Sequence, residues 1–270
     1  MANSPPTTDP IDGAPVRSDP IGDRYYKPLR RADAAGDWLF WIAAILSFAA
    51  VAMDKDAAPR IYGWINIIFI IAVAATFIIG IACRLYLTPR AEDNRRKDLI
   101  ANSFDTSLTH ESTTGYYNNA EKNPFRRIVV SVMESCFFTG RIAQLMLFRV
   151  RLLTAGYFLA FAICVLTRET DLGLIGAGAQ AIFSEIVLSK WLRLEWLRHR
   201  SEQTYDAIGQ LVRTGGSFNR EHVRAQALEL VARYETSKAN AGVVLSNALF
   251  EKHNPPLTKE WDAIRSTLPR

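Results

Sequence analysis

The sequence predicts an all-α integral membrane protein with four transmembrane helices, both termini in the cytoplasm and helical extensions on the cytoplasmic side. The first observation is that apolar and polar residues are segregated along the chain. The mean hydropathy is only +0.01 although 49% of the 270 residues are apolar, so the average hides this segregation. The apolar residues gather in two blocks in the first third and two around the middle, so windowed hydropathy is informative. Basic residues flank these blocks mostly on one side, and no segment shows the alternation typical of a strand.

The first two apolar blocks, residues 38–53 and 61–83, are bounded by charges and separated by a short charged linker. The second block is long enough to cross about 30 Å of hydrocarbon at about 1.5 Å per helical residue. The first is shorter, and we expect it to recruit residues near Asp37 and to place its tryptophans at the interface. A buried hairpin of a soluble protein is the alternative, which the short linker disfavours.

The third and fourth blocks, residues 152–167 and 172–188, are shorter or more polar. Arg151 and Arg168 enclose the third block, so their side chains have to extend to the membrane interfaces. The turn between the two blocks is too short for anything but an antiparallel helical hairpin. We therefore expect two further spans, with a hydrophobic hairpin of a soluble protein as the competing interpretation.

The distribution of basic residues orients these spans. On the side of the two termini, 16 Lys and Arg residues directly flank the blocks, against 3 in the two opposite loops. The 16 are Arg24, Lys27, Arg30, Arg31, Arg84, Arg90, Arg95, Arg96, Lys97, Arg141, Arg149, Arg151, Lys190, Arg193, Arg198 and Arg200. Cytoplasmic flanks of membrane helices are enriched in Lys and Arg. Both termini are therefore expected in the cytoplasm.

The polar sequence divides the chain into five parts. The first, residues 1–23, contains five prolines and scattered aspartates and predicts a disordered leader. The other four are a first transmembrane hairpin (24–87), a cytoplasmic loop with an amphipathic helix (88–150), a second transmembrane hairpin (151–191) and a cytoplasmic helical domain (192–270).

Two predictions concern the polar helices. Residues 127–150 form a helix whose apolar stretch, 128–138, is too short to span, which indicates an interfacial or pore-proximal helix. A later helix runs from near Asn219 to about Lys252. The Asn-Pro-Pro sequence at 254–256 is expected to end it, and a final short helix follows.

No residue set for catalysis, a metal or a cofactor stands out, and we expect the protein not to be an enzyme. The three cysteines lie far apart, and the four histidines show no metal-binding spacing. Residues 176–181 fit G-x-G-x-x-A, but they lie inside a hydrophobic block with no strand before them. Small residues four apart in this block instead indicate close helix packing, at Gly173, Ala177 and Ala181.

The fourth block contains the polar residues that a pore would use. Gln180 and Ser184 are four apart on one helical face, with Glu185 adjacent. Ionisable groups within a span usually face a bundle interior or water, so these three are candidates for pore lining. In the alternative interpretation, Glu185 lies near Lys190 at the cytoplasmic interface and is solvated or paired there.

A second candidate site combines cations with an aromatic ring. Arg193, Trp196 and Arg200 fall on one face of the helix that follows the fourth span, which suits phosphate binding and base stacking. The alternative is an ordinary aromatic belt with its basic flank. Three further arginines are candidates for a shared basic pocket: Arg126, Arg127 and Arg141.

Two segments resemble a known family. Residues 111–143 contain Tyr-Tyr-Asn-Asn at 116–119 and Glu-Ser-Cys-Phe-Phe-Thr at 134–139. These elements resemble the central motif of the SMODS-associated four-transmembrane effector family, and residues 241–264 resemble the tail module of related proteins.

The resemblance implies a bacterial inner-membrane effector of anti-phage defence. Such effectors are oligomeric channels, here a tetramer or similar, that depolarise the membrane and cause abortive infection. The implied partner is a nucleotidyltransferase that makes a nucleotide or oligonucleotide signal, and Tyr116 and Tyr117 of the motif join the ligand-binding candidates. In the similar Hailong-type systems a DNA oligomer holds the channel shut, so the resemblance leaves the direction of gating open.

Two other functions remain open. A non-conducting four-span anchor would recruit a partner protein through its cytoplasmic helices. A membrane enzyme acting on lipid would depend on Glu185 or on the pair His110 and Glu111.

Overall fold

The computed structural model describes residues 18–117, 119, 121–166, 185–214 and 216–269, and in these ranges it is helical with no strand. A lone antiparallel bridge joins Ser18 to Thr114. The elements are η1 (Gly22–Tyr26), α1 (Lys27–Ala52), α2 (Pro59–Ala82), η2 (Cys83–Leu87), α3 (Thr88–Phe104), α4 (Pro124–Leu166), η3 (Glu185–Ser189), α6 (Lys190–Thr214), α7 (Glu221–Ala241) and α8 (Asn247–Ser266).

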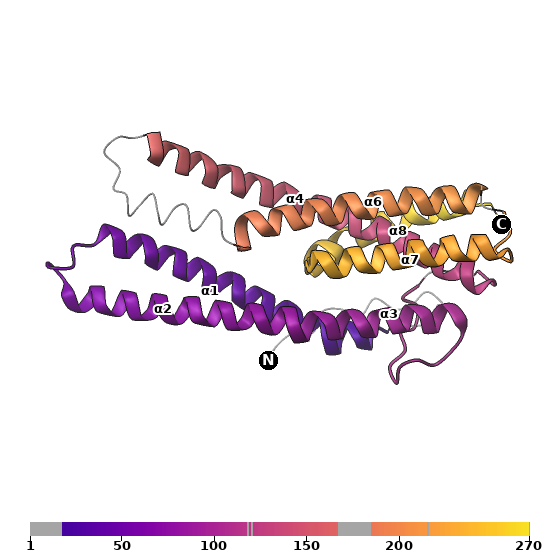
Figure 1. The fold of residues 1–270 in the computed structure, drawn as a ribbon, viewed down its shortest axis with the longest axis horizontal. Helices are drawn as coiled ribbons and strands as arrows, with labels where there is room; N and C mark the ends of the chain where they lie inside the picture. The colour runs from indigo at the N-terminus through magenta and orange to yellow at the C-terminus, as the bar shows by residue number, and fades with distance from the viewer. Residues whose placement is uncertain (1–17, 118, 120, 167–184, 215, 270) are drawn as a thin grey trace.

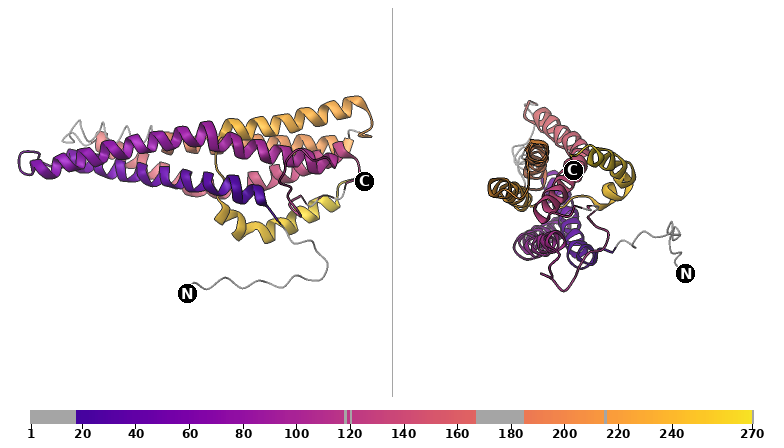
Figure 2. Two further views of the ribbon diagram at one scale, coloured as in Figure 1. Left: turned by 90° about the horizontal axis from the view of Figure 1, so that it is seen from below. Right: turned by 90° about the vertical axis from the view of Figure 1, so that its right-hand side faces the viewer.

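The helices form an elongated molecule with an apolar end and a polar end (Figure 1). The hairpin of α1 and α2 extends to the same side as the C-terminal half of α4, whereas α3, α7 and α8 gather at the other end. Figure 2 shows α7 and α8 on opposite sides of the molecule; α7 contacts α4 and α6, and α8 contacts α4. We call the group of α3, the N-terminal half of α4, α6, α7 and α8 the polar bundle. We call the group of α1, α2 and the C-terminal half of α4 the apolar arm.

Two wide helical turns in the first hairpin have a common cause. The π-helical turns η1 and η2 each lead into a helix with a proline in its first turn, Pro28 in α1 and Pro89 in α3. Proline lacks an N–H donor, and its ring crowds the carbonyl four residues earlier, here Arg24 and Leu85. A π turn at that point gives the ring room without ending the helix. As a result, residues 59–104 remain one continuous run of 46 helical residues.

The N-terminal half of α4 is the centre of the polar bundle. Ile128, Val129, Val132, Met133 and Cys136 are each at most 2% exposed and pack against α3, α6, α7 and α8. Of the two interpretations of residues 127–150, the interfacial helix is therefore wrong, and the pore-proximal helix stays a prediction. Its apolar face is covered by other helices of the same chain, which the amphipathic pattern alone does not distinguish from a membrane surface.

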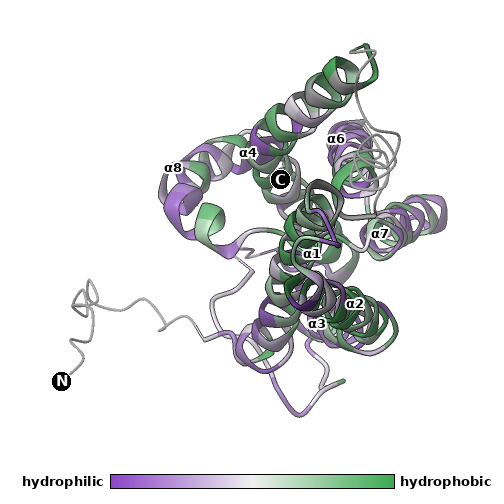
Figure 3. Ribbon diagram, turned by 90° about the vertical axis from the view of Figure 1, so that its left-hand side faces the viewer, coloured by the Kyte–Doolittle hydropathy of each residue, from purple (hydrophilic) through white to green (hydrophobic). Residues whose placement is uncertain are grey.

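The apolar arm carries the candidate membrane spans. Within the described residues, three helical runs are long and apolar enough to cross a bilayer: Gly22–Ala50, Pro59–Phe104 and Pro124–Ile163. Large apolar side chains are exposed along them. Figure 3 shows the hydrophobic residues of these helices in green on the ribbon. These runs contain most of the first three expected spans. Most of the expected fourth span, residues 172–184, lies outside the described residues.

The ends of the last two helices differ from the sequence prediction. Helix α7 ends at Gly242, whose left-handed backbone (φ 54°) lets its N–H donate to the Lys238 carbonyl. Ser246 then caps α8 by accepting from the Leu249 N–H at 3.3 Å. Pro255 and Pro256 lie inside α8, so the prediction that they end a helix is wrong. Both prolines are exposed, so the carbonyls that lose a donor there can bind water.

The N-terminal segment joins the fold earlier than expected. Ser18 and Thr114 exchange two backbone hydrogen bonds of 2.9 and 3.0 Å, and the helix begins at Pro20. Ile21 is fully buried. Residues 18–23 of the expected disordered leader are thus part of the packed structure, and residues 1–17 lie outside the described residues.

Candidate functional site

Three elements meet at one partly buried carboxylate where the first hairpin enters the polar bundle. Glu92 of α3 forms an ion pair with Lys238 of α7 at 2.6 Å and accepts a hydrogen bond of 3.0 Å from the hydroxyl of Tyr26. Lys238 also pairs with Glu235, one turn earlier, at 3.4 Å. We call Tyr26, Glu92, Glu235 and Lys238 the joint, because its contacts link η1, α3 and α7.

Burial makes the charges of the joint interdependent. Burial opposes the charge of Lys238, but the carboxylates of Glu92 and Glu235 outweigh it and raise the pKa of Lys238 well above its usual value. Burial also raises the pKa of Glu235, although Lys238 pulls in the opposite direction. Removal of one partner would leave the other charges largely desolvated and without their counter-ion. The joint therefore resists separation of α7 from α3.

A second set of polar contacts ties the N-terminal segment and the motif loop to α3. Arg95 donates a 2.8 Å hydrogen bond to Asp19, and its guanidinium lies 4.1 Å from the centre of the Tyr116 ring. Asp98 accepts from the backbone N–H and the hydroxyl of Thr113, at 3.1 and 2.7 Å. Tyr116 is thus half-buried and stacked on a cation of its own chain.

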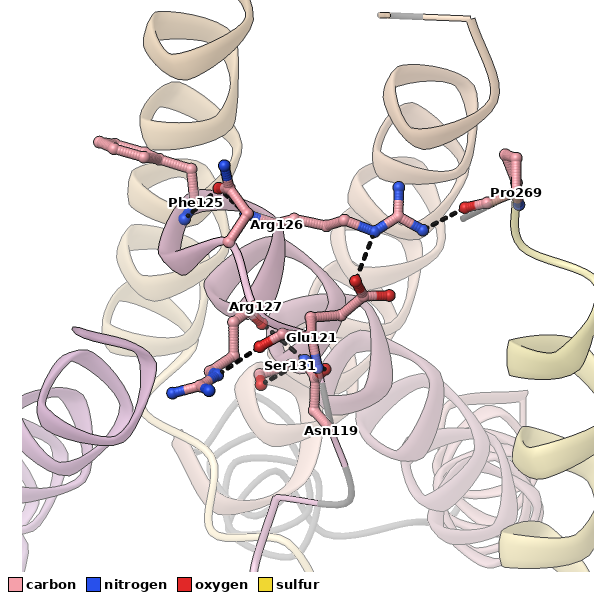
Figure 4. Close-up of polar contacts among 8 residues, drawn as sticks. Asn119, Glu121, Phe125, Arg126, Arg127, Ser131 and Pro269 are labelled. Atoms are coloured by element: carbon pink, nitrogen blue, oxygen red, sulfur yellow. Dashed lines mark hydrogen bonds and ion pairs between the residues drawn. The ribbon is translucent and has the colours of Figure 1, made fainter. Parts of the chain in front are cut away.

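Arg126 and Arg127 start α4 and hold the motif loop in place (Figure 4). Arg126 pairs with Glu121 at 2.8 Å and donates to the carbonyl of Pro269 near the C-terminus. Arg127 donates to the Glu121 carbonyl and to the Asp105 carboxylate, each at 2.8 Å. Both guanidinium groups therefore bind groups of the same chain.

Asn119 of the motif anchors the loop to the first turns of α4. Its side-chain amide donates to the Arg127 carbonyl at 2.7 Å and to the Ser131 hydroxyl at 3.2 Å (Figure 4). Its side-chain oxygen accepts from the Glu121 N–H at 3.0 Å. Tyr117, two residues before it, packs against the core of the bundle. These contacts give the motif residues a role in holding the loop.

The remaining basic candidates point to different surroundings. Arg141 pairs with Glu260 of α8, and Arg200 donates to Gln203 at 3.1 Å. Arg193 lines a cleft beside Gly242. Trp196 lies in a separate hollow. The structure therefore does not bring the predicted arginines into one basic pocket.

The hollow around Trp196 is a shallow feature of the outer surface of α6, with a volume of about 480 Å³. The indole of Trp196 is 39% exposed. Two basic and two acidic residues share the hollow with it: Arg198, His199, Glu195 and Glu202. Glu195 is in turn held by Arg151 at 2.5 Å, a contact that lowers the pKa of Glu195.

A larger cleft, with a volume of about 1380 Å³, lies between the first hairpin and the start of α6. Its walls come from α1, α2, α3, the first turn of α6 and the chain around Gly242. Lys190 crosses one end of it to pair with Asp37 of α1 at 2.6 Å. The cleft thus extends from the apolar arm to the polar bundle.

Several predicted residues cannot be placed. Gln180 and Ser184, proposed for pore lining, and the packing stripe Gly173, Ala177 and Ala181 lie outside the described residues. The backbone of Glu185 begins η3, and its side chain lies outside the description. Among the described residues, no group of three or more His, Cys, Asp or Glu side chains could hold a metal ion.

Sequence reasoning missed the joint, although a signal for it exists. Val231, Tyr234 and Lys238 follow one another at helical spacing, and all three lie on the buried side of α7. A lysine that continues an apolar stripe is a candidate for a buried ion pair. Its partner, Glu92, is distant in the sequence, so only the tertiary structure identifies it.

Comparisons with known proteins identify no relative. No protein-family model matches the chain, and no curated protein or solved structure is significantly similar to it.

Proposed function

We propose that this protein is an oligomeric pore of a bacterial inner membrane, opened or closed by its cytoplasmic polar bundle. The observation that carries the proposal is the 43-residue helix α4, which is the buried centre of the bundle at one end and an exposed apolar helix at the other. In keeping with the family resemblance, its effect would be membrane depolarisation and abortive infection. Both termini lie in the cytoplasm in this proposal.

The long helices provide the mechanical link. A continuous helix transmits displacement at one end to the other, and both α4 and the run 59–104 cross from the bundle into the apolar arm. The joint fastens the second of these runs to α7 through Lys238 and Glu92. A signal that favours one arrangement of the bundle would shift the membrane helices with it, provided it binds the two states with different affinity.

The hollow around Trp196 is the site that we propose for the nucleotide or oligonucleotide signal. An exposed indole provides a stacking surface for a base, and Arg198 provides a cation for phosphate. Arg193 and Arg200 lie on neighbouring turns of the same helix. Arg198 itself pairs with Glu202 at 2.8 Å, so a phosphate would have to displace that carboxylate. Arg126, Arg127 and Arg141 also pair with carboxylates of this chain and lie outside the hollow, which makes them weaker candidates.

We propose that the path is lined by the polar residues of the fourth span. Gln180, Ser184 and Glu185 would face the centre of a tetramer or similar assembly, and the exposed apolar faces of α1 and α2 would contact lipid. Oligomerisation is needed because one four-span chain provides too few helices to enclose an aqueous path.

Ion and dye release from liposomes tests this proposal. The purified protein is reconstituted and assayed alone, with cyclic dinucleotides and with short DNA oligonucleotides. We expect release that changes when one of these probes is added, in either direction, because the direction of gating is open.

The variant Trp196→Ala should lose the response to the probe and keep the basal release. The matched control is Trp64→Ala, which removes an indole that is 65% exposed on α2. Absence of any release under every condition would refute a pore.

A non-conducting anchor is the second candidate. It is favoured by the internal ion pairs of Arg126, Arg127 and Arg141, which hold the bundle together and leave these cations less available to a ligand. An anchor would leave the membrane potential of expressing cells unchanged and would retain a partner protein stoichiometrically on purification. Depolarisation in the absence of any partner would exclude it.

A further inference from the structure

The cleft beside α1 and α2 has one apolar wall. Its lining over this length comes from aromatic and aliphatic side chains of the two helices, and these helices form the apolar arm. The principal apolar residues are Phe40, Ala43, Phe48, Phe69, Val73 and Phe77. A wall of this kind excludes a freely hydrated ligand and suits a hydrocarbon chain.

The other end of the cleft is charged. Lys190 pairs there with Asp37 at 2.6 Å and approaches Asp33 at 3.9 Å. Arg84 of η2 and Arg193 of α6 line the same end. Both signs of charge are thus present where the apolar segments of α1 and α2 give way to the polar bundle, the depth at which a lipid headgroup lies.

We propose that this cleft binds one phospholipid per chain, with an acyl chain along α1 and α2 and the phosphate beside Lys190, Arg193 and Arg84. An amphiphile matches both ends of the cleft at once. A purely apolar ligand would leave the charged groups without a polar partner, and a free nucleotide would leave the aromatic wall uncovered. The volume of about 1380 Å³ exceeds the roughly 300–1,000 Å³ of ordinary small-molecule sites, which suits a lipid. The inference goes beyond the proposed pore and stands whether or not the protein conducts.

A bound lipid would contact both halves of the molecule. Its acyl chain would lie on α1 and α2, and its headgroup would reach α6 and the end of α7 at Gly242. The lipid would therefore fill the space between the first hairpin and the bundle, next to the joint. Its occupancy would stabilise the present arrangement of these two parts by mass action.

Two glycines of α2 provide a matched pair of variants. Gly80 lines the cleft, and a Cβ atom added there meets nothing within 4 Å, so Gly80→Phe directs a ring into the cleft from a position with room for its first atom. Gly63 lies on the same helix outside the cleft lining and also has open space around it. Gly63→Phe therefore adds the same apolar group without blocking the site.

The test uses the full chain reconstituted with phosphatidylethanolamine, solubilised in mild detergent and weighed by native mass spectrometry. We expect the wild type and Gly63→Phe to retain a lipid in stoichiometric amount, and Gly80→Phe to retain less by about tenfold or more, equivalent to about 1.4 kcal/mol of binding free energy. Circular dichroism and elution volume check that both variants fold. Equal retention by both variants overturns the proposal. So does an altered oligomeric mass of Gly80→Phe with unchanged lipid, because the cleft would then hold a second copy.

A second arm tests the headgroup. Phosphatidylglycerol should also be retained by the wild type, whereas diacylglycerol, which lacks the phosphate, should be lost. Arg193→Gln should weaken retention of both phospholipids, and Arg198→Gln, on the other side of α6 in the hollow around Trp196, should not. Equal retention of diacylglycerol, or displacement of the lipid by inorganic phosphate alone, contradicts the proposal.

Discussion

The two halves of α4 are both rich in apolar residues, but their surroundings are opposite. Ile142 and Leu147 are at most 1% exposed within the polar bundle, whereas Leu159 and Ile163 are 64% and 57% exposed in the apolar arm. The first half packs against other helices of the chain, and the second is exposed and apolar enough to cross a membrane. One continuous helix thus contributes to two apolar surfaces, of which the described helices cover only the first. Substitutions in the two halves should therefore differ in cost, and the following predictions test that difference.

The largest effect is expected at the joint. Lys238→Met leaves Glu92 and Glu235 buried without their cation and should lower the free energy of unfolding by about 3–5 kcal/mol. Thermal and chemical denaturation in detergent, followed by circular dichroism, measures the change. The control Lys259→Met alters an exposed lysine of α8 and should be nearly neutral. Adding Glu92→Gln to Lys238→Met should restore part of the loss. An unchanged free energy of unfolding in Lys238→Met would show that the joint does not hold α7 to α3.

The next largest effect compares the two halves of α4 directly. Leu147→Ala opens a cavity in the bundle and should cost about 2–5 kcal/mol. Leu159→Ala removes the same atoms from an exposed position and should cost less than about 0.5 kcal/mol. The same denaturation experiment measures both variants. Equal costs would indicate that the apolar arm is packed within the monomer, against the exposure of its side chains.

A smaller effect concerns the pH dependence of the joint. Burial raises the pKa of Glu235 in the folded protein, so the folded state binds a proton more tightly than the unfolded state does. Stability should therefore rise as the pH falls through the folded pKa towards the ordinary value of 4.5. Glu235→Gln should remove this dependence and raise the Tm at pH 7 by about 2–4 °C, the shift expected from about 1 kcal/mol. Glu92→Gln should lower it, and a Tm that falls in both variants would contradict this assignment.

The smallest effect is expected at the surface of the bundle. Arg141 and Glu260 form an ion pair whose side chains are 46% and 42% exposed. Exposed pairs contribute about 0–1 kcal/mol, so Arg141→Gln should change the free energy of unfolding by no more than that. High salt should change the free energy of unfolding of this variant little, because the exposed ion pair is already absent. A loss comparable to that of Lys238→Met would remove the distinction between the buried and the exposed contacts.

The helical content and the apolar runs could be predicted from the sequence because they depend on local composition and period. Helix α2 (Pro59–Ala82) matches the predicted block 61–83 within two residues at each end. Helix α1 ends within one residue of the predicted block 38–53 but begins earlier, at Lys27. The break between α7 and α8 was misplaced because the pattern favours prolines as helix ends, whereas Gly242 and Ser246 provide the actual cap geometry. Exposed prolines cost a helix less than their rank in propensity scales indicates, since water binds the freed carbonyls.

The candidate sites were harder to predict. Arg126, Arg127 and Arg141 read as a basic pocket in the sequence, because a list of cations does not reveal the carboxylates that face them. Glu121 is close in sequence to Arg126, but Glu260 lies on a different helix from Arg141. The cleft is likewise invisible to sequence reasoning, since its walls come from segments as distant as Asp33 and Arg193.

The helical class, the long apolar helices and the basic polar segments between them are all readable from the amino-acid sequence. Each of these properties follows from composition and spacing within single helices. Three features depend on the packing of distant helices: the protein cover over the apolar face of residues 128–147, the ion pair of Lys238 with Glu92, and the cleft between the first hairpin and α6. The hydrophobic effect favours removal of apolar side chains from water, whether lipid or protein covers them. Which of the two covers a given helix therefore depends on which other helices the fold brings beside it.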